Sequence, residues 1–316
     1  GRDMLDNRIV LHAVFVLLLP LVVAAFGLSI WTALLLVVLA LLWRWAIVLV
    51  GFVRPPAGPD MALETISASH FVEKVRWCMD RLGLEYEEVP WGGTLGAFYL
   101  GRTVPRLHFR TGMVRSQIGN SPEILRYLWG AYGTTRRDAA AFLEPTEERL
   151  AFEHTIDRCG VSLQVWIYYH LLDDPALCKH AWGADSEAIP AWQRKLVGLL
   201  YPVQAAMIRR AFRVNETNYR KSCERIETLL AETEARLADG RRSILGDETI
   251  NYTDIAFAAI QGAWLQPEGY GGGAGIRIER SAVPAAMRHD IERWIGDYPR
   301  VTRFIEALYA EERHDD

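Results

Sequence analysis

Residues 9–53 form one almost uninterrupted apolar run, and no other feature of the sequence limits its fold as strongly. Between Arg8 and Arg44 there is no charged side chain, and the run continues beyond Arg44. A single helix that crosses a bilayer needs about 20 apolar residues. The run is long enough for two such helices, and residues 27–29 (Gly-Leu-Ser) are the best place for a turn between them. We predict a transmembrane helical hairpin, with one span kinked at Pro20 as the alternative.

Basic residues flank the apolar run. Arg8 precedes it, and Arg44 and Arg54 lie at its end. Because positively charged flanks favour the cytoplasmic side of a membrane, a hairpin would place both flanks there. We therefore expect a membrane protein whose remaining chain faces the cytoplasm, with the lipid bilayer as one partner.

The composition argues against several classes of partner and cofactor. The net charge is −4, so nothing indicates a nucleic-acid partner. The four cysteines lie far apart and form no Cys-x-x-Cys pair, which argues against a zinc, haem or dithiol site. We expect no metal. These cysteines are Cys78, Cys159, Cys178 and Cys223.

The hydrophobic pattern divides the chain into segments. We predict a tail over residues 1–8, a Pro- and Gly-rich linker over 54–61, an α/β domain over 62–133 and an all-helical domain over 134–316. In the α/β domain the alternation predicts strands at 63–67, 86–91, 104–109 and 113–117, and the spacing predicts helices over 72–82 and from residue 121. Gly83 would close the first of these helices.

Residues 250–255 (Ile-Asn-Tyr-Thr-Asp-Ile) carry a helix start signal. Asn251 stands at the N-cap and Asp254 can bond back to it, which is a variant of the capping box. The uncharged residues 256–264 that follow predict a buried helix.

Four segments resemble conserved motifs of the glutathione transferase superfamily, in the family's order. They are residues 69–76 (Ser-His-Phe-Val-Glu-Lys-Val-Arg), 103–107 (Thr-Val-Pro-Arg-Leu), 120–125 (Asn-Ser-Pro-Glu-Ile-Leu) and 250–255. The resemblance covers roughly residues 62–312. It implies a thioredoxin-like domain followed by an all-α domain, with glutathione as co-substrate.

The resemblance assigns the sulfur of glutathione to Ser69. A hydroxyl at a helix N-terminus can donate to the thiolate, and the helix dipole favours the anion. Alone, Ser69 could be a plain N-cap, and Ser67 is a rival hydroxyl. The resemblance further implies that Val104, beside a cis Pro105, pairs with the cysteinyl part of glutathione.

The γ-glutamyl end is assigned to Asn120 and Ser121. Ser121 at a helix start can bind the carboxylate. Asn120 stands where the family usually has an acid that pairs with the amine, so we expect lower glutathione affinity. His70 stands where the family commonly has Pro, and a surface position suits it better than a charge beside the thiolate.

We therefore expect a membrane-anchored transferase that joins glutathione to a small apolar electrophile, with a homodimer as a possible state. Aromatic residues on the first long helix of the all-helical domain are candidates for the electrophile site; they are Trp166, Tyr168, Tyr169 and His170. Two alternatives stay open. One is a non-enzymatic scaffold or transport protein on the same fold, as in metaxin-like relatives. The other is a glutathione-dependent dehalogenase or etherase.

Overall fold

The computed structural model describes residues 18–19, 21–27, 29–53, 58–66, 68–90, 105–111, 114–187, 189–273 and 275–314. The predicted tail, part of the predicted linker, and the candidate site residues Ser67 and Val104 lie outside the described residues.

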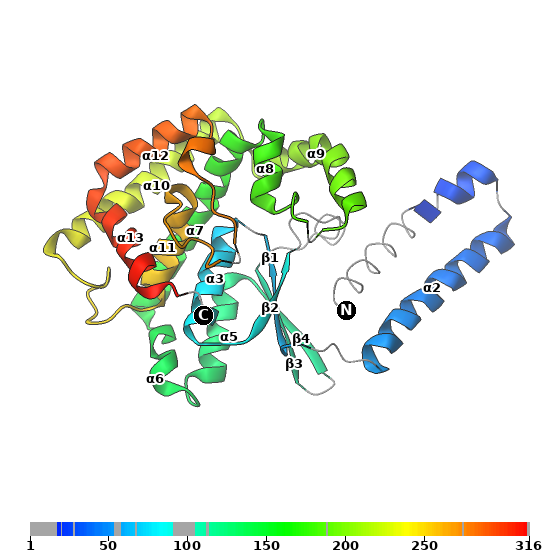
Figure 1. Ribbon diagram of the computed structural model, residues 1–316, viewed down its shortest axis with the longest axis horizontal. Coiled ribbons are helices and arrows are strands. Elements are labelled where there is room, and N and C mark those ends of the chain that lie inside the picture. The colour runs from blue at the N-terminus through cyan, green and yellow to red at the C-terminus, as the bar shows by residue number, and fades with distance from the viewer. Residues whose placement is uncertain are drawn as a thin grey trace.

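Helix α2 (Ile30–Val53) stands apart from the sheet and from the helices that follow it in the chain (Figure 1). Its large apolar side chains are exposed on several sides, with Trp31, Leu35 and Leu42 each more than half exposed. Among the helices of the described segments, none combines the length and the apolarity that crossing a membrane requires.

A four-stranded sheet follows, in the order β2-β1-β3-β4. Its strands are β1 (Met61–Thr65), β2 (Tyr86–Pro90), β3 (Arg106–Thr111) and β4 (Val114–Gly119). β1 pairs parallel with β2 and antiparallel with β3, and β3 pairs antiparallel with β4. This arrangement is the thioredoxin-like sheet that the resemblance implied. The first strand lies two residues earlier than predicted, because the chain turns after Thr65 and the Ser69 N–H donates to the Ile66 carbonyl at 3.0 Å.

Helices α3 (His70–Arg81) and α5 (Ser121–Tyr132) pack against each other, and α5 also packs against β3 and β4. Leu63 of β1 and Leu107 of β3 are fully buried. As predicted, Gly83 closes α3, with φ +65° and its N–H bonded to the Asp80 carbonyl at 2.9 Å.

The second half of the described chain is helical. Its helices are the short α6 (Arg137–Ala140), α7 (Glu147–Leu171), α8 (Pro175–Trp182), α9 (Ala191–Ala211), α10 (Glu216–Arg236), α11 (Tyr252–Leu265), α12 (Ala285–Asp297) and α13 (Pro299–Glu312). Every residue of α11 is buried, and this helix packs against α3, α7 and α13. One apolar core therefore joins the sheet half to the helical half.

The capping box at the start of α11 is present as predicted. The Asn251 side chain accepts from the Thr253 N–H at 2.8 Å, and Asp254 accepts from the Asn251 N–H at 2.9 Å. Asp254 also accepts from the Ser243 hydroxyl at 2.8 Å and from the Ile244 N–H at 2.9 Å. The carboxylate therefore fastens the preceding loop to the helix as well as capping it.

Candidate functional site

The sheet topology brings three of the predicted site segments to one edge. Because β1 ends where β3 begins and where β4 ends, Ser69, Pro105 and Asn120 follow or precede strands at this same edge. The Asn120 N–H donates to the Pro105 carbonyl at 3.2 Å, which joins two of these segments directly. In the sequence, Pro105 and Asn120 lie more than 30 residues after Ser69.

Ser69 is the N-cap of α3. Its backbone is extended, with φ −70° and ψ 125°, and its Oγ accepts from the Val72 N–H at 3.4 Å. Its hydroxyl oxygen thus holds one bond as an acceptor, while its proton can be donated to an anion at the positive end of the helix. Ser69 also lines a cavity, described below.

Ser121 lies at the start of α5 and is buried against a charged network. The Lys74 ammonium donates to Ser121 Oγ at 3.3 Å and to both oxygens of Asp157 at 3.0 and 3.2 Å, and it lies 3.6 Å from Glu153. Lys74 itself is completely buried. Because the oxygen of Ser121 accepts from a cation, its own proton remains available for an outside acceptor.

Arg126 completes this network by donating to both oxygens of Glu153, at 3.1 and 2.9 Å. Burial raises the pKa of Asp157, and Lys74 opposes that shift. Sequence reasoning missed this network, since Lys74 is joined to α7 residues about 80 positions away and no local pattern indicates the contact.

Asn120 has an unusual backbone. Its φ is +70°, in the region that non-glycine residues rarely adopt, and its side chain is exposed and makes no cap bond to α5. Strained residues of this kind are concentrated at binding and catalytic sites. The exposed amide is therefore placed at the sheet edge without being used to cap the helix.

The interpretation of His70 as a surface residue is wrong. His70 is buried, and its Nε2–H donates to the Gly160 carbonyl at 2.8 Å, so it links α3 to α7. Burial lowers its pKa to about 4, which keeps the ring neutral at pH 7. Gly160 permits the approach, because a Cβ there would lie 2.7 Å from the Phe71 ring. His70 therefore supplies no charge to a thiolate.

We expect His70 to make the protein sensitive to acid. The unfolded chain binds a proton at His70 near pH 6.5, while the folded chain does so only near pH 4. Stability from the neutral ring is complete above pH 6.5 and falls as the pH drops towards 4, by up to about 3 kcal/mol. The free energy of unfolding, measured by denaturant titration between pH 4 and 7, should depend less on pH for His70→Gln than for wild type. The exposed His289→Gln should keep the wild-type dependence on pH. Equal slopes for His70→Gln and wild type would contradict the assignment.

A cavity of about 290 Å³ opens beside Ser69. Its walls come from the loop before α3 and from α7, α8 and the end of α9, and they are mainly apolar and aromatic. The lining residues are Ile66, Ala68, Ser69, His70, Gln164, Ile167, Tyr168, Leu171, Cys178, Ala181, Trp182 and Phe212. The Ala68 N–H donates to the Ala181 carbonyl at 3.1 Å, which fixes α8 against the Ser69 loop.

One of the four aromatic candidates lines this cavity. Tyr168 does so, stacked on Phe212 at 5.7 Å and accepting from the Trp182 indole N–H at 3.3 Å. Trp166 and His170 instead contact Asp290 at 3.0 and 3.3 Å on the far side of α7. Tyr169 stacks on Tyr219 at 4.1 Å. Sequence reasoning missed Trp182 and Phe212, because helical periodicity does not indicate that α8 and α9 fold over the Ser69 loop.

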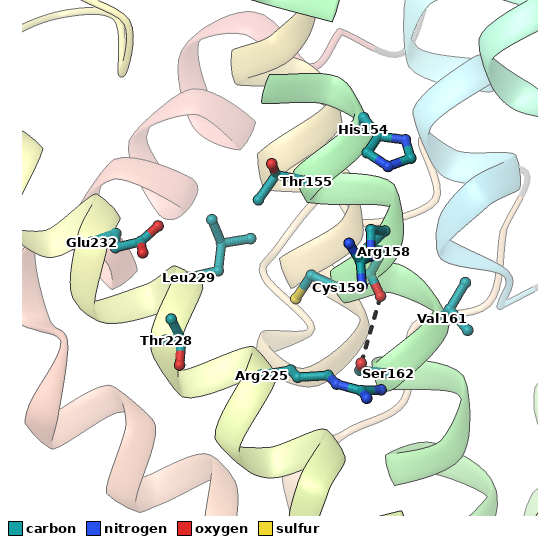
Figure 2. A pocket seen from close by; sticks show the side chains of 10 residues that line it. All are labelled: His154, Thr155, Arg158, Cys159, Val161, Ser162, Arg225, Thr228, Leu229 and Glu232. Carbon is teal, nitrogen blue, oxygen red and sulfur yellow. Dashed lines mark hydrogen bonds between the residues drawn. The ribbon is translucent and has the colours of Figure 1, made fainter. Parts of the chain in front are cut away.

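A second and larger groove, of about 430 Å³, lies between α7 and α10 (Figure 2). Figure 2 shows Arg225 of α10 reaching toward Ser162 of α7, whose hydroxyl donates to the Arg158 carbonyl at 3.5 Å. The thiol on its floor is Cys159, and burial raises its pKa to about 12, so it is protonated at neutral pH. This groove holds none of the predicted site residues, and its one thiol is unreactive.

All four cysteines are free and buried. Within the described part of the chain, no group of three or more His, Cys, Asp or Glu side chains could hold a metal ion.

No family model matches the chain, and no curated protein is similar to it in sequence. Solved structures with a similar arrangement include a glutathione S-transferase from Methylobacterium radiotolerans in complex with glutathione sulfonate, at 17% identity and a TM-score of 0.47, covering 81% of this chain and 95% of that chain. A glutathione S-transferase from Methylobacillus flagellatus with glutathione bound is 16% identical, with a TM-score of 0.45, and covers 80% of this chain and 99% of that chain. The β-etherase LigF from Sphingobium is 16% identical, with a TM-score of 0.42, and the match covers 78% of this chain and 99% of that chain. These likenesses do not extend to activity.

Proposed function

We propose that this chain binds glutathione at the sheet edge and joins it, through its thiolate sulfur, to a small apolar electrophile. The observation that carries the proposal is the juxtaposition at one edge of Ser69, Pro105 and Ser121 with the apolar cavity beside Ser69. A polar peptide site next to an apolar cavity suits a reaction between a peptide thiol and an apolar molecule.

The γ-glutamyl end would bind at the start of α5. Its carboxylate would accept the Ser121 hydroxyl proton, because the Lys74 ammonium already donates to Ser121 Oγ at 3.3 Å. The dipole of α5 favours the anion at this helix start. The Asn120 amide oxygen would accept from the ammonium group. An amide carries no charge, so this contact is weaker than the one a carboxylate would make.

The sulfur would lie at Ser69. The hydroxyl would donate to the thiolate, and the N-terminus of α3 would add its partial positive charge, so the thiol loses its proton to solvent more readily. The thiolate then forms a carbon–sulfur bond with the electrophilic carbon, and the leaving group departs with its bonding electrons. Tyr168, Trp182 and Phe212 would hold the electrophile against the sulfur.

Membrane attachment through the apolar N-terminal region, with the remaining chain facing the cytoplasm, is part of the same proposal. Its support is the exposed apolar surface of α2, which is far larger than water-exposed helices usually carry.

We expect Ser69→Ala to slow conjugation about ten- to a hundredfold and to raise the pKa of the thiol of bound glutathione. The reason is that a hydrogen bond to a charged group contributes about 1.5–3 kcal/mol. Glutathione affinity should fall much less, since Ser121 is unchanged. The measurement is the ultraviolet absorbance of the bound thiolate against pH, together with turnover of an aromatic halide. Ser67→Ala is the matched control for the neighbouring hydroxyl.

Two results would contradict the assignment. If Ser69→Ala equals wild type in both thiol pKa and rate, Ser69 has no role in the chemistry. If the wild-type chain is not retained on immobilised glutathione, the scaffold alternative replaces the enzyme.

A further inference from the structure

Helix α9 carries an apolar stripe on its outer face. Its inner face is buried and includes Val197 and Tyr201, as a helix packed on a core requires. On the opposite side, four large apolar residues are exposed at positions that step by seven, four and four. Their exposed fractions are 41% for Trp192, 76% for Leu199, 57% for Val203 and 57% for Met207. At 100° per residue these four side chains lie within about 80° of one another on the helix surface.

The charge of α9 sets it apart from the rest of the protein. The whole chain has a net charge of −4. Within α9 there are four basic residues and no acidic residue, which gives +4; the basic residues are Arg194, Lys195, Arg209 and Arg210. Arg209 is paired with Asp173, but both side chains are largely exposed. An apolar stripe on a helix with only positive charges is typical of helices that lie in the interface of an anionic bilayer.

We propose that the outer face of α9 docks onto an anionic lipid surface, independently of the N-terminal apolar region. The stripe would enter the boundary between head groups and acyl chains. The three exposed basic residues of α9, Lys195, Arg209 and Arg210, would contact the lipid phosphates and carboxylates. A two-fold contact between copies of this chain suits the surface less well, because it would bring two helices of charge +4 together.

Docking of α9 on lipid would also bear on the cavity beside Ser69, because the inner face and the end of α9 adjoin that cavity. Tyr201 on its inner face donates to the Leu172 carbonyl at 2.6 Å and contacts Trp182 with ring centroids 5.7 Å apart. Phe212, which follows the last residue of α9, lines the cavity beside Ser69. Figure 1 shows α8 and α9 beside each other at one end of the helical half. A docked α9 would thus hold the cavity next to the lipid, where apolar molecules collect. This last consequence rests on the proposed function; the docking itself does not.

The test places a nitroxide spin label at Val203→Cys in the full chain, reconstituted into phosphatidylcholine vesicles that contain about 30% phosphatidylserine. The four native cysteines are buried and should label poorly. The matched control is a label at Lys221→Cys, an exposed residue of α10. We expect the ratio of oxygen to aqueous nickel accessibility to be at least about threefold higher at 203 than at 221, because an interfacial helix sinks about 5–10 Å into the head-group boundary.

A second variant tests the contribution of charge by replacing the three exposed basic residues of α9, Lys195, Arg209 and Arg210, by Gln. We expect the accessibility ratio at 203 to fall toward that at 221 in this variant. The same fall is expected in labelled Val203→Cys with its basic residues intact when phosphatidylserine is left out. Glutathione retention serves as the separate readout, and it should be the same in all variants.

Three results would overturn the proposal. Equal accessibility at 203 and 221 in anionic vesicles would mean that α9 faces water. Dipolar coupling between labels at 203 of two molecules would assign the stripe to a second copy. If the label at 203 is protected from nickel whether or not phosphatidylserine is present, a segment of the same chain covers the stripe. If the wild-type chain is not retained on immobilised glutathione while the label at 203 is still buried in lipid, the proposed function is rejected and the docking stands.

Discussion

Replacing Lys74 by Met should lower the free energy of unfolding by about 3–5 kcal/mol, because removing one partner of a buried ion pair leaves the other charge uncompensated. The Lys74 ammonium is completely buried and is the counter-charge of Asp157, 3.0 Å away. The measurement is thermal unfolding of the full chain, followed by near-ultraviolet circular dichroism in one detergent for all variants. We expect the midpoint to fall by about 10 °C or more.

A double variant separates the lost charge from lost packing. Adding Asp157→Leu to Lys74→Met should recover part of the stability, since Glu153 keeps both bonds from Arg126. Lys221→Met, at an exposed position, is the control and should leave the midpoint nearly unchanged. If Lys74→Met unfolds within a degree of wild type, the buried network does not hold the two halves together.

The same variant tests the site. If Lys74 orients the Ser121 hydroxyl toward the γ-glutamyl carboxylate, Lys74→Met should weaken glutathione binding in calorimetry below its unfolding temperature. Binding that is unchanged in the folded variant would mean that Lys74 has a structural role only.

Replacing Asp254 by Ala should also cost about 3–5 kcal/mol, which exceeds the roughly 1 kcal/mol of an ordinary helix cap. The side chain is fully buried and accepts from Ser243, Ile244 and Asn251. Its loss leaves these buried donors without an acceptor, and each such donor costs about 1–3 kcal/mol. The same thermal unfolding measurement applies.

The control is Asp239→Ala. Asp239 is exposed and bonds mainly to Arg241, two residues away, so its removal should hardly move the unfolding midpoint. Glutathione binding by folded Asp254→Ala should equal that of wild type. Normal unfolding together with lost binding would place Asp254 in a site instead of a cap.

Local signals in the sequence predicted features that are local in the structure. The bond from Asn251 to Asp254 spans three residues, and Gly83 needs only its own positive φ, so both follow from short-range geometry. The alternation of strands with helices before residue 133 predicted the sheet half, and the helical spacing beyond it predicted the helical half. The pattern also placed a helix start at Ser69 and another near Ser121, because helix starts depend on a few neighbouring residues. The N-cap of the second helix is Asn120, and Ser121 is its first residue instead of the cap that the Ser-Pro pair predicts.

Only the tertiary structure decided what those residues contact. The Lys74 bond to Asp157 joins residues 83 positions apart, and the His70 bond to Gly160 joins residues 90 positions apart. The periodicity of α3 marks a buried face, but it does not distinguish a buried cation from an exposed one, since that depends on which helix packs against it. The cavity and the outer stripe of α9 have the same origin: a hydrophobic pattern shows that a side chain is apolar, while the packing of α7, α8 and α9 decides whether that side chain faces the core, the cavity or the surroundings.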